Sequence, residues 1–344
     1  MNLTLLWIDL LRGALELSTG SAFIAALGAA LVVIGGMTRR LVFLLLPLGF
    51  GLLIGGLGGF NPTNAFGYLY TGGISTSFLP LAGLFLLGFE TDFLPLLARP
   101  RLLAAALPVA LGIFGSFILA GALGFPLKEA ATVALAGSLN PASLLYAANA
   151  LSPDLVGPLG LVTAFVLILL RWSASRMQTA PEPIPQLPEE AAALSEPAGF
   201  PNLLIFALVI VALVGVFFRP GLPLAAAFFL GVVFRREEAK GEAAPWVRTA
   251  AQIVIALTSL AIGCSLSAGV LFTPVALEAV LAVIFGAVLT FGGSWLILRS
   301  ARIEASPGRG GYFAASTLAS ILPGIELVGI LVTSILMTIV LAVS

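Results

Sequence analysis

Ten apolar runs follow one another along this chain of 344 residues, and they constrain its fold more than any other feature. A helix that crosses a bilayer needs about 20 mostly apolar residues, because the hydrocarbon core is about 30 Å thick. Backbone groups must be satisfied internally in lipid, so spanning segments of this length are helices. The sequence therefore predicts an all-α polytopic membrane protein with spans near 20–37, 41–59, 76–90, 102–124, 154–171, 202–218, 221–234, 249–264, 274–298 and 325–343.

The composition agrees with a bilayer environment. Hydrophobic residues make up 60% of the chain and charged residues only 9%, whereas a soluble domain averages about 25% charged residues. The net charge is zero, so nothing indicates a nucleic-acid partner. The chain has no histidine and a single cysteine, Cys264, which excludes histidine-ligated metals, cysteine clusters and disulfide frameworks.

Two segments are expected to lie outside the bilayer core. Residues 1–18 carry Asp9, Arg12 and Glu16 among apolar residues at helical spacing, which favours an amphipathic interfacial helix over a signal peptide. Residues 173–201 are rich in proline and glutamate and have no hydrophobic period, so they read as an extended connector. These segments leave a first membrane repeat, 19–172, and a second, 202–344.

The stretch "AGSLNPASLLYAANA", residues 136–150, interrupts an otherwise lipid-soluble region with a proline and several polar side chains. Basic residues concentrate in cytoplasmic loops, and they separate cleanly only if 129–150 enters and leaves the membrane on one side. Arg12, Lys128 and Arg219 then fall outside. The cytoplasmic set is Arg39, Arg40, Arg99, Arg101, Arg171, Arg176, Arg235, Arg236, Lys240, Arg248, Arg299, Arg302 and Arg309.

The two halves also resemble each other. Residues 86–115 align with 261–292, which places Gly88 on Gly263, and residues 46–56 align with 222–234. Chance similarity among helices rich in Leu, Ala and Gly is the alternative. Because the matched segments would cross in opposite directions, we expect about 10–11 transmembrane helices in two inverted repeats, each with a broken or re-entrant helix, as in secondary transporters.

The two proline-containing segments are the candidate binding site. A proline in a helix frees a carbonyl and removes a donor, and such a break survives in a membrane only if it is buried in protein or lines a polar cavity. Simple kinks, with the hydroxyls bonded back to their own helix, are the alternative. The candidates are Ser138, Asn140, Pro141 and Ser143 in the first half and Ser316, Ser320 and Pro323 in the second.

Three acidic residues complete the candidates. Glu326 follows the second proline closely and is the only charge after Arg309. An acid within a span is costly and indicates a cation ligand or a proton carrier, unless Glu326 lies close enough to an interface to be wet. Glu90 and Asp92 end one span, and they are either a solvated helix terminus or secondary site residues.

Several motifs carry a family resemblance that covers almost the whole chain after residue 20. They are "LLLPLGFGLLIGGL", "LAGLFLLGFETDFLPLLARPRLL", "RPGLPLAAAFFLGVVFRREEA" and "IALTSLAIGCSLSAGVLFTPVALEAVLAVIFG". They resemble the β subunit of sodium-ion-translocating decarboxylases, which act on oxaloacetate, methylmalonyl-CoA or glutaconyl-CoA. The resemblance implies an integral membrane subunit that decarboxylates carboxybiotin presented by a partner and couples this reaction to sodium export through an elevator-like fold.

The chain departs from the family pattern at the positions that the resemblance implies are functional. The sodium-binding aspartate of the first broken segment corresponds to Leu139, and tyrosines expected near residues 164–166 are absent. Ser320 matches a family serine, whereas a family asparagine and arginine fall at Gly311 and Leu327. Sodium could still be held by Ser138, Asn140 and Ser320.

Two functions from different classes follow. In the first, the chain is a decarboxylase β subunit in the inner (plasma) membrane, with a biotin-bearing carboxyltransferase α subunit and a small γ subunit as partners. It would then be part of a sodium-translocating carboxy-lyase. In the second, it is a stand-alone carrier of a small carboxylate or ion. Either way, we expect no cofactor bound by this chain, biotin only on a partner, and a homo-oligomer.

Overall fold

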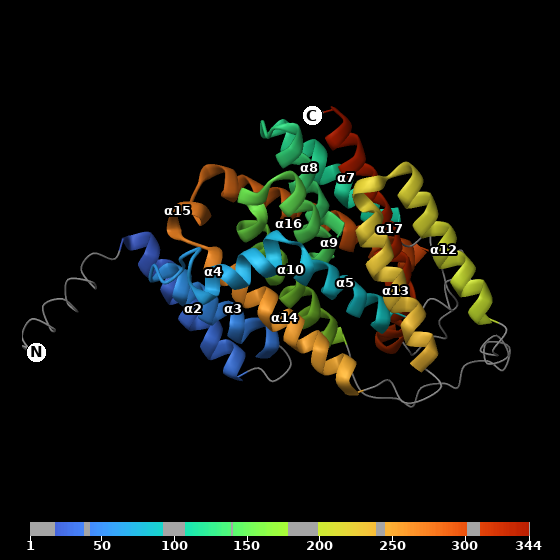
Figure 1. Ribbon diagram of the computed structural model, residues 1–344, viewed down its shortest axis with the longest axis horizontal. Helices are drawn as coiled ribbons and strands as arrows, with labels where there is room; N and C mark the ends of the chain where they lie inside the picture. Colours follow the sequence, from blue (N-terminus) through green and yellow to red (C-terminus); the bar gives the residue numbers. More distant parts are fainter. Residues whose placement is uncertain are drawn as a thin grey trace, which may run out of the picture.

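The computed structural model describes residues 18–37, 42–91, 107–138, 140–177, 199–238, 245–300 and 310–343, and every regular element within them is a helix. Figure 1 shows the helices packed side by side into one bundle, with the C-terminus beside the turn between α7 and α8. The predicted all-α fold is therefore confirmed.

The first half of the chain alternates long helices with short, irregular ones. In order, they are α2 (Thr19–Met37), α3 (Val42–Gly56), α4 (Ala65–Leu69), the π-helix η1 (Tyr70–Ser75), α5 (Phe78–Glu90), α7 (Leu107–Ala122), α8 (Leu127–Leu135), the 3₁₀ turn η3 (Ala136–Ser138), α9 (Pro141–Leu151), the 3₁₀ turn η4 (Pro153–Leu155) and α10 (Val156–Met177).

The second half is more regular and ends on the longest helix. Its elements are α12 (Gly199–Phe217), the 3₁₀ turn η5 (Arg219–Gly221), α13 (Leu222–Glu238), α14 (Pro245–Ser265), α15 (Ala268–Leu271), α16 (Pro274–Ser300) and α17 (Gly310–Val343). Helix α10 thus runs to Met177, past the boundary expected at 172, and α12 begins at Gly199. Residues 1–17 and 178–198 lie outside the described residues.

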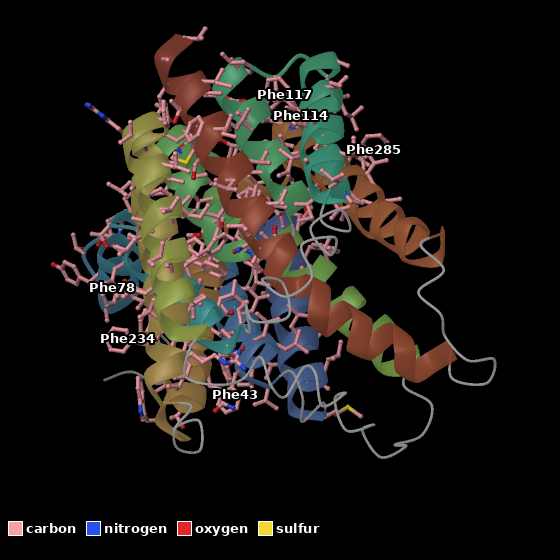
Figure 2. All side chains as sticks on the ribbon, turned by 90° about the vertical axis from the view of Figure 1, so that its right-hand side faces the viewer. Phe43, Phe78, Phe114, Phe117, Phe234 and Phe285 are labelled. Atoms are coloured by element: carbon pink, nitrogen blue, oxygen red, sulfur yellow. The ribbon has the colours of Figure 1, made fainter. Side chains whose placement is uncertain are left out.

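The surface of the bundle is apolar, as a bilayer requires. Phe43, Phe78, Phe114, Phe234 and Phe285 are exposed and project from its periphery in Figure 2. Among the described residues, Thr19–Met37 and Glu326–Val343 are long and apolar enough to cross a membrane by themselves. The segment Ala65–Ser75 and α5 would form one further span that bends by 57°, and six shorter apolar helices accompany these spans. The chain is a membrane protein.

The helices run between two ends of the bundle. We call them the Lys128 end and the Arg235 end, after a charged residue that lies at each. At the Lys128 end, α7 gives way to α8, and α15 leads into α16. Helices α7 and α16 are antiparallel, because the Ser116 hydroxyl donates to the carbonyl of Ala282 at 3.0 Å while Pro108 lies against Gly293. At the Arg235 end, the Arg235 guanidinium donates to the backbone carbonyl of Glu90 at 2.7 Å.

The contacts between the two halves have a repeated pattern. Gly88 of α5 lies against the carbonyl of Phe228 in α13. The aligned glycine of the second half, Gly263 of α14, lies in the same way against the carbonyl of Leu48 in α3. A Cβ atom at Gly263 would be 2.6 Å from that oxygen, so only glycine permits such a close approach.

The first proline-containing segment is broken, as predicted. Helix α8 leads inward from the Lys128 end to η3, where Gly137 meets Gly112 near the middle of α7. Helix α9 then returns. Asn149 near its end donates to the carbonyl of Ser75, the last residue of η1, and α5 begins shortly afterwards at Phe78. Helix α5 reaches the Arg235 end only at Glu90, so α8 and α9 form a hairpin that opens to the Lys128 end.

The second proline-containing segment is not broken, and this part of the prediction is wrong. Helix α17 continues without interruption through Pro323 and Gly324. The difference lies in the residue before each proline. Asn140 precedes Pro141 and caps the new helix with its side chain, whereas Leu322 precedes Pro323 and has no polar group that could cap a helix.

Candidate functional site

Asn140 organises the break between η3 and α9. Its backbone is extended (φ −105°, ψ 100°), as expected for a residue that precedes proline. Its side-chain Oδ1 accepts hydrogen bonds from the backbone N–H groups of Ala142 and Ser143, each at 3.1 Å. Pro141 occupies the first helical position, where its missing donor costs nothing. The sequence Asn-Pro thus starts a helix inside the protein.

Small residues and one threonine hold η3 in place. Gly137 packs against Gly112 of α7, so that a Cβ atom would lie 2.9 Å from the Gly112 carbonyl oxygen. The Thr290 hydroxyl of α16 donates to the carbonyl of Gly137 at 2.7 Å. Because this carbonyl lies at a break in the helix, the hydroxyl satisfies an acceptor that would otherwise be left unpaired in an apolar interior.

The carboxylate of Glu326 in α17 meets this break. The Asn140 side-chain amide donates from Nδ2 to Oε2 of Glu326. One turn further along α17, Gly329 lies against Ser138, whose Cβ would be 3.6 Å from a Cβ added at Gly329. Ser138, Asn140 and Glu326 are 1%, 2% and 7% exposed. Two segments that are distant in sequence therefore build one buried polar site.

The charge of the site decides which ions it suits. Among the described residues, Asn140 is the only side chain that donates to Glu326, and none of them forms an ion pair with this carboxylate. The described residues also include no cluster of three or more His, Cys, Asp or Glu side chains. One carboxylate with neutral oxygen ligands suits a hard monovalent cation or a proton better than a transition metal.

Ser143 adds an uncommitted oxygen in the first turn of α9. Its backbone N–H donates to Asn140, but its hydroxyl is fully buried and has no hydrogen-bond partner within the part of the chain that the structure describes. The Ser138 hydroxyl accepts from the backbone N–H of Asn140 at 3.3 Å. Ser138, Asn140 and Ser143 thus lie at one break in the chain, and Asn140 contacts Glu326 directly.

For the other predicted site residues, the part of the chain that the structure describes shows no side-chain contact with Asn140 or Glu326. Ser316, Ser320 and Pro323 belong to α17, but their side chains lie outside the described set. Glu90 is exposed at the end of α5, where its backbone carbonyl accepts from Arg235. Asp92 lies outside the described residues.

Two polar residues of α9 that the sequence did not single out as site residues join it to distant elements. Asn149 donates to the carbonyl of Ser75 at 2.6 Å and to the hydroxyl of Ser77 at 3.1 Å. Tyr146 donates to the carbonyl of Pro220 in η5 at 3.2 Å. Amide and phenol groups in an apolar helix were the only signals, and the sequence gives no indication of such distant partners.

Comparison with known proteins agrees with the resemblance. The family described as "Na+-transporting oxaloacetate decarboxylase beta subunit" matches residues 20–297. The methylmalonyl-CoA decarboxylase subunit beta of Veillonella parvula is 31% identical over 149 residues, which are 42% of this chain and 39% of that protein. The glutaconyl-CoA decarboxylase subunit beta of Acidaminococcus fermentans is 28% identical over 147 residues, again 42% and 39%. The matches thus span about two fifths of the length of these relatives.

Proposed function

We propose that this chain, which belongs to the family of Na⁺-transporting oxaloacetate decarboxylase beta subunits, is the membrane subunit of a sodium-transporting decarboxylase. In this proposal the buried site around Asn140 and Glu326 binds the sodium ion as cargo. The single observation that carries it is the Glu326 carboxylate, which lies at the break between η3 and α9 and faces Asn140.

Glu326 supplies the negative charge that Leu139 does not. The resemblance places a sodium-binding aspartate at position 139, where this chain has leucine. Glu326 lies beside the neighbouring Asn140, so a carboxylate reaches the same break from α17. Neutral hydroxyls of Ser138 and Ser143 would complete the coordination, because sodium requires hard oxygen ligands.

We further propose that the chain forms two inverted repeats, residues 19–172 and 202–344, which alternate access to this site. The equivalent contacts at Gly88 and Gly263 support a two-fold relation between the halves, and so does the antiparallel crossing of α7 and α16. Arg235 lies at the opposite end from Lys128 and Arg219, as expected if the Arg235 end faces the cytoplasm.

The proposal includes partners and a location. The relatives are named as beta subunits of decarboxylases, so a biotin-bearing carboxyltransferase and a small γ subunit would complete the assembly in the inner membrane. Biotin would then reside on a partner and not on this chain. A homo-oligomeric core of this subunit is also part of the proposal.

Reconstitution tests the proposal. The purified chain in proteoliposomes should take up radiolabelled sodium when carboxybiotin is supplied, and Glu326→Gln should reduce this uptake at least tenfold because the site loses its charge. Vesicles that contain the Glu278→Gln variant are the matched control, because this variant loses an acidic side chain elsewhere on a membrane helix. Unchanged sodium uptake in the Glu326→Gln variant would contradict the proposal that Glu326 binds the ion. Transport of malonate-like anions without any partner would instead favour a stand-alone carrier.

A further inference from the structure

Helix α17 carries a line of positions that continues from Glu326 toward the Lys128 end. Residues at i, i+3 and i+7 share one face of a helix, and Glu326, Gly329 and Thr333 have this spacing. Glu326 meets Asn140 and Gly329 meets Ser138, so this face packs on the broken segment. Thr333 lies about 10 Å further along the helix axis than Glu326, at about 1.5 Å per residue.

The Thr333 hydroxyl is unusual among the helical hydroxyls of this protein. Serine and threonine within helices ordinarily donate to a carbonyl one turn earlier. The next two hydroxyl residues of α17 do so: Ser334 donates to Ile330 at 2.7 Å and Thr338 donates to Ser334 at 2.8 Å. Thr333 is fully buried, yet its Oγ1 has no partner among the described residues.

Such a hydroxyl needs a physical explanation. An unsatisfied buried polar group is destabilising, and a change of the χ1 rotamer normally removes this cost because the hydroxyl then bonds back to the helix. Thr333 keeps a free donor and free lone pairs on the face that also carries Glu326. A group that stays available in this way is suited to a ligand that passes only transiently.

We propose that the Thr333 hydroxyl is a polar step on the route of the transported cation between Glu326 and the Lys128 end of the bundle. The inference rests on the proposed function, because Glu326 must first bind that cation. A hard monovalent cation that has left the carboxylate and moved about 10 Å along this face would be coordinated by the Thr333 oxygen before it meets bulk water. The rate at which the cation exchanges between the site and solvent would depend on this hydroxyl, whereas the equilibrium affinity of the site for the cation would not.

The test separates these two quantities. Full-length chain carrying Thr333→Val, which keeps the side-chain volume but removes the hydroxyl, is reconstituted, and both equilibrium binding and exchange of radiolabelled sodium are measured. We expect the affinity to stay within twofold and the exchange rate to fall about tenfold, the factor that corresponds to about 1.4 kcal/mol. Thr333→Ser, which keeps the hydroxyl, should exchange at nearly the native rate.

The control is Thr163→Val, because Thr163 is also buried but donates to the carbonyl of Leu159 at 2.7 Å. Exchange in Thr333→Val as fast as in Thr163→Val would overturn the polar step while leaving the proposed site intact. If Thr333→Val does not fold, slower exchange in Thr333→Ala than in Thr333→Ser supports the step, and equal rates overturn it. Absence of sodium binding to the native chain would overturn both the step and the proposed function.

Discussion

Asn140 combines a structural and a chemical role in one side chain. Its Oδ1 caps α9 through the N–H groups of Ala142 and Ser143, while its Nδ2 donates to Glu326. A carboxylate in hydrocarbon is stable only with partners that replace its hydration. The amide therefore fixes where α9 begins and also stabilises the acid that we propose to bind sodium.

This double role can be measured with a double-mutant cycle. Asn140→Ala should destabilise the protein by about 2–4 kcal/mol, because it removes a helix cap and leaves a buried carboxylate without its donor. In the Glu326→Gln variant the same substitution should cost less, because the neutral amide that loses its donor is less costly to leave unpaired than a carboxylate. Thermal unfolding in detergent, followed by tryptophan fluorescence, gives the four stabilities. Additive effects of the two substitutions would contradict the coupling.

At the scale of the elements, two prolines in apolar segments have different consequences. Pro141 follows a capping asparagine and starts α9, whereas Pro323 lies inside the continuous α17. Proline is tolerated within membrane helices where neighbouring groups accommodate the freed carbonyl. The hairpin of α8 and α9 is therefore the irregular part of the site, and α17 passes it as a continuous helix.

Pro323→Ala tests whether α17 must break during transport. Because the helix already continues through this position, we expect sodium uptake within twofold of native and an equal or higher melting temperature. A proline-to-alanine change inside a helix can stabilise by as much as about 3 kcal/mol. Pro47→Ala, at a proline inside α3, is the matched control. A selective loss of uptake in Pro323→Ala would show that transport needs the proline at this position.

At the scale of the whole molecule, the two halves hold each other through glycine contacts that recur in both. Lipid tails are as apolar as leucine, so membrane helices associate through close packing rather than through the hydrophobic effect. Gly88 and Gly263 each bring a helix backbone against a carbonyl of the other half. This is the pattern of contacts that the proposed inverted repeats would produce.

Equivalent glycines should respond equally to substitution. Gly88→Ala and Gly263→Ala should each lower the stability by about 1–3 kcal/mol or more, because the added methyl group meets backbone that cannot move aside. Gly36→Ala is the control, since nothing lies within 4 Å of a Cβ at that position, and it should be neutral or slightly stabilising. Melting temperatures of the three variants, compared with that of the native chain, test this prediction. Tolerance at only one of the two positions would argue against the two-fold relation.

The apolar runs, the Asn-Pro pair and the isolated Glu326 could be read from the sequence because each has a local physical cause. Bilayer thickness fixes the length of a span, and proline after a capping residue starts a helix wherever it occurs. The all-α membrane fold, the family and the break at Asn140 were accordingly predicted. The prediction of a matching break at Pro323 was wrong because it relied on the proline and the nearby serines and did not weigh the apolar residue directly before the proline.

Only the tertiary structure decided which polar groups meet. The bond between Asn140 and Glu326, the support of Gly137 by Thr290, and the contact of Asn149 with Ser75 all join residues far apart in the chain. Helical spacing shows which residues of one helix share a face, but not which helix that face will contact. That choice depends on the packing of the whole bundle, where small residues allow some helices to approach closely and larger side chains keep others apart.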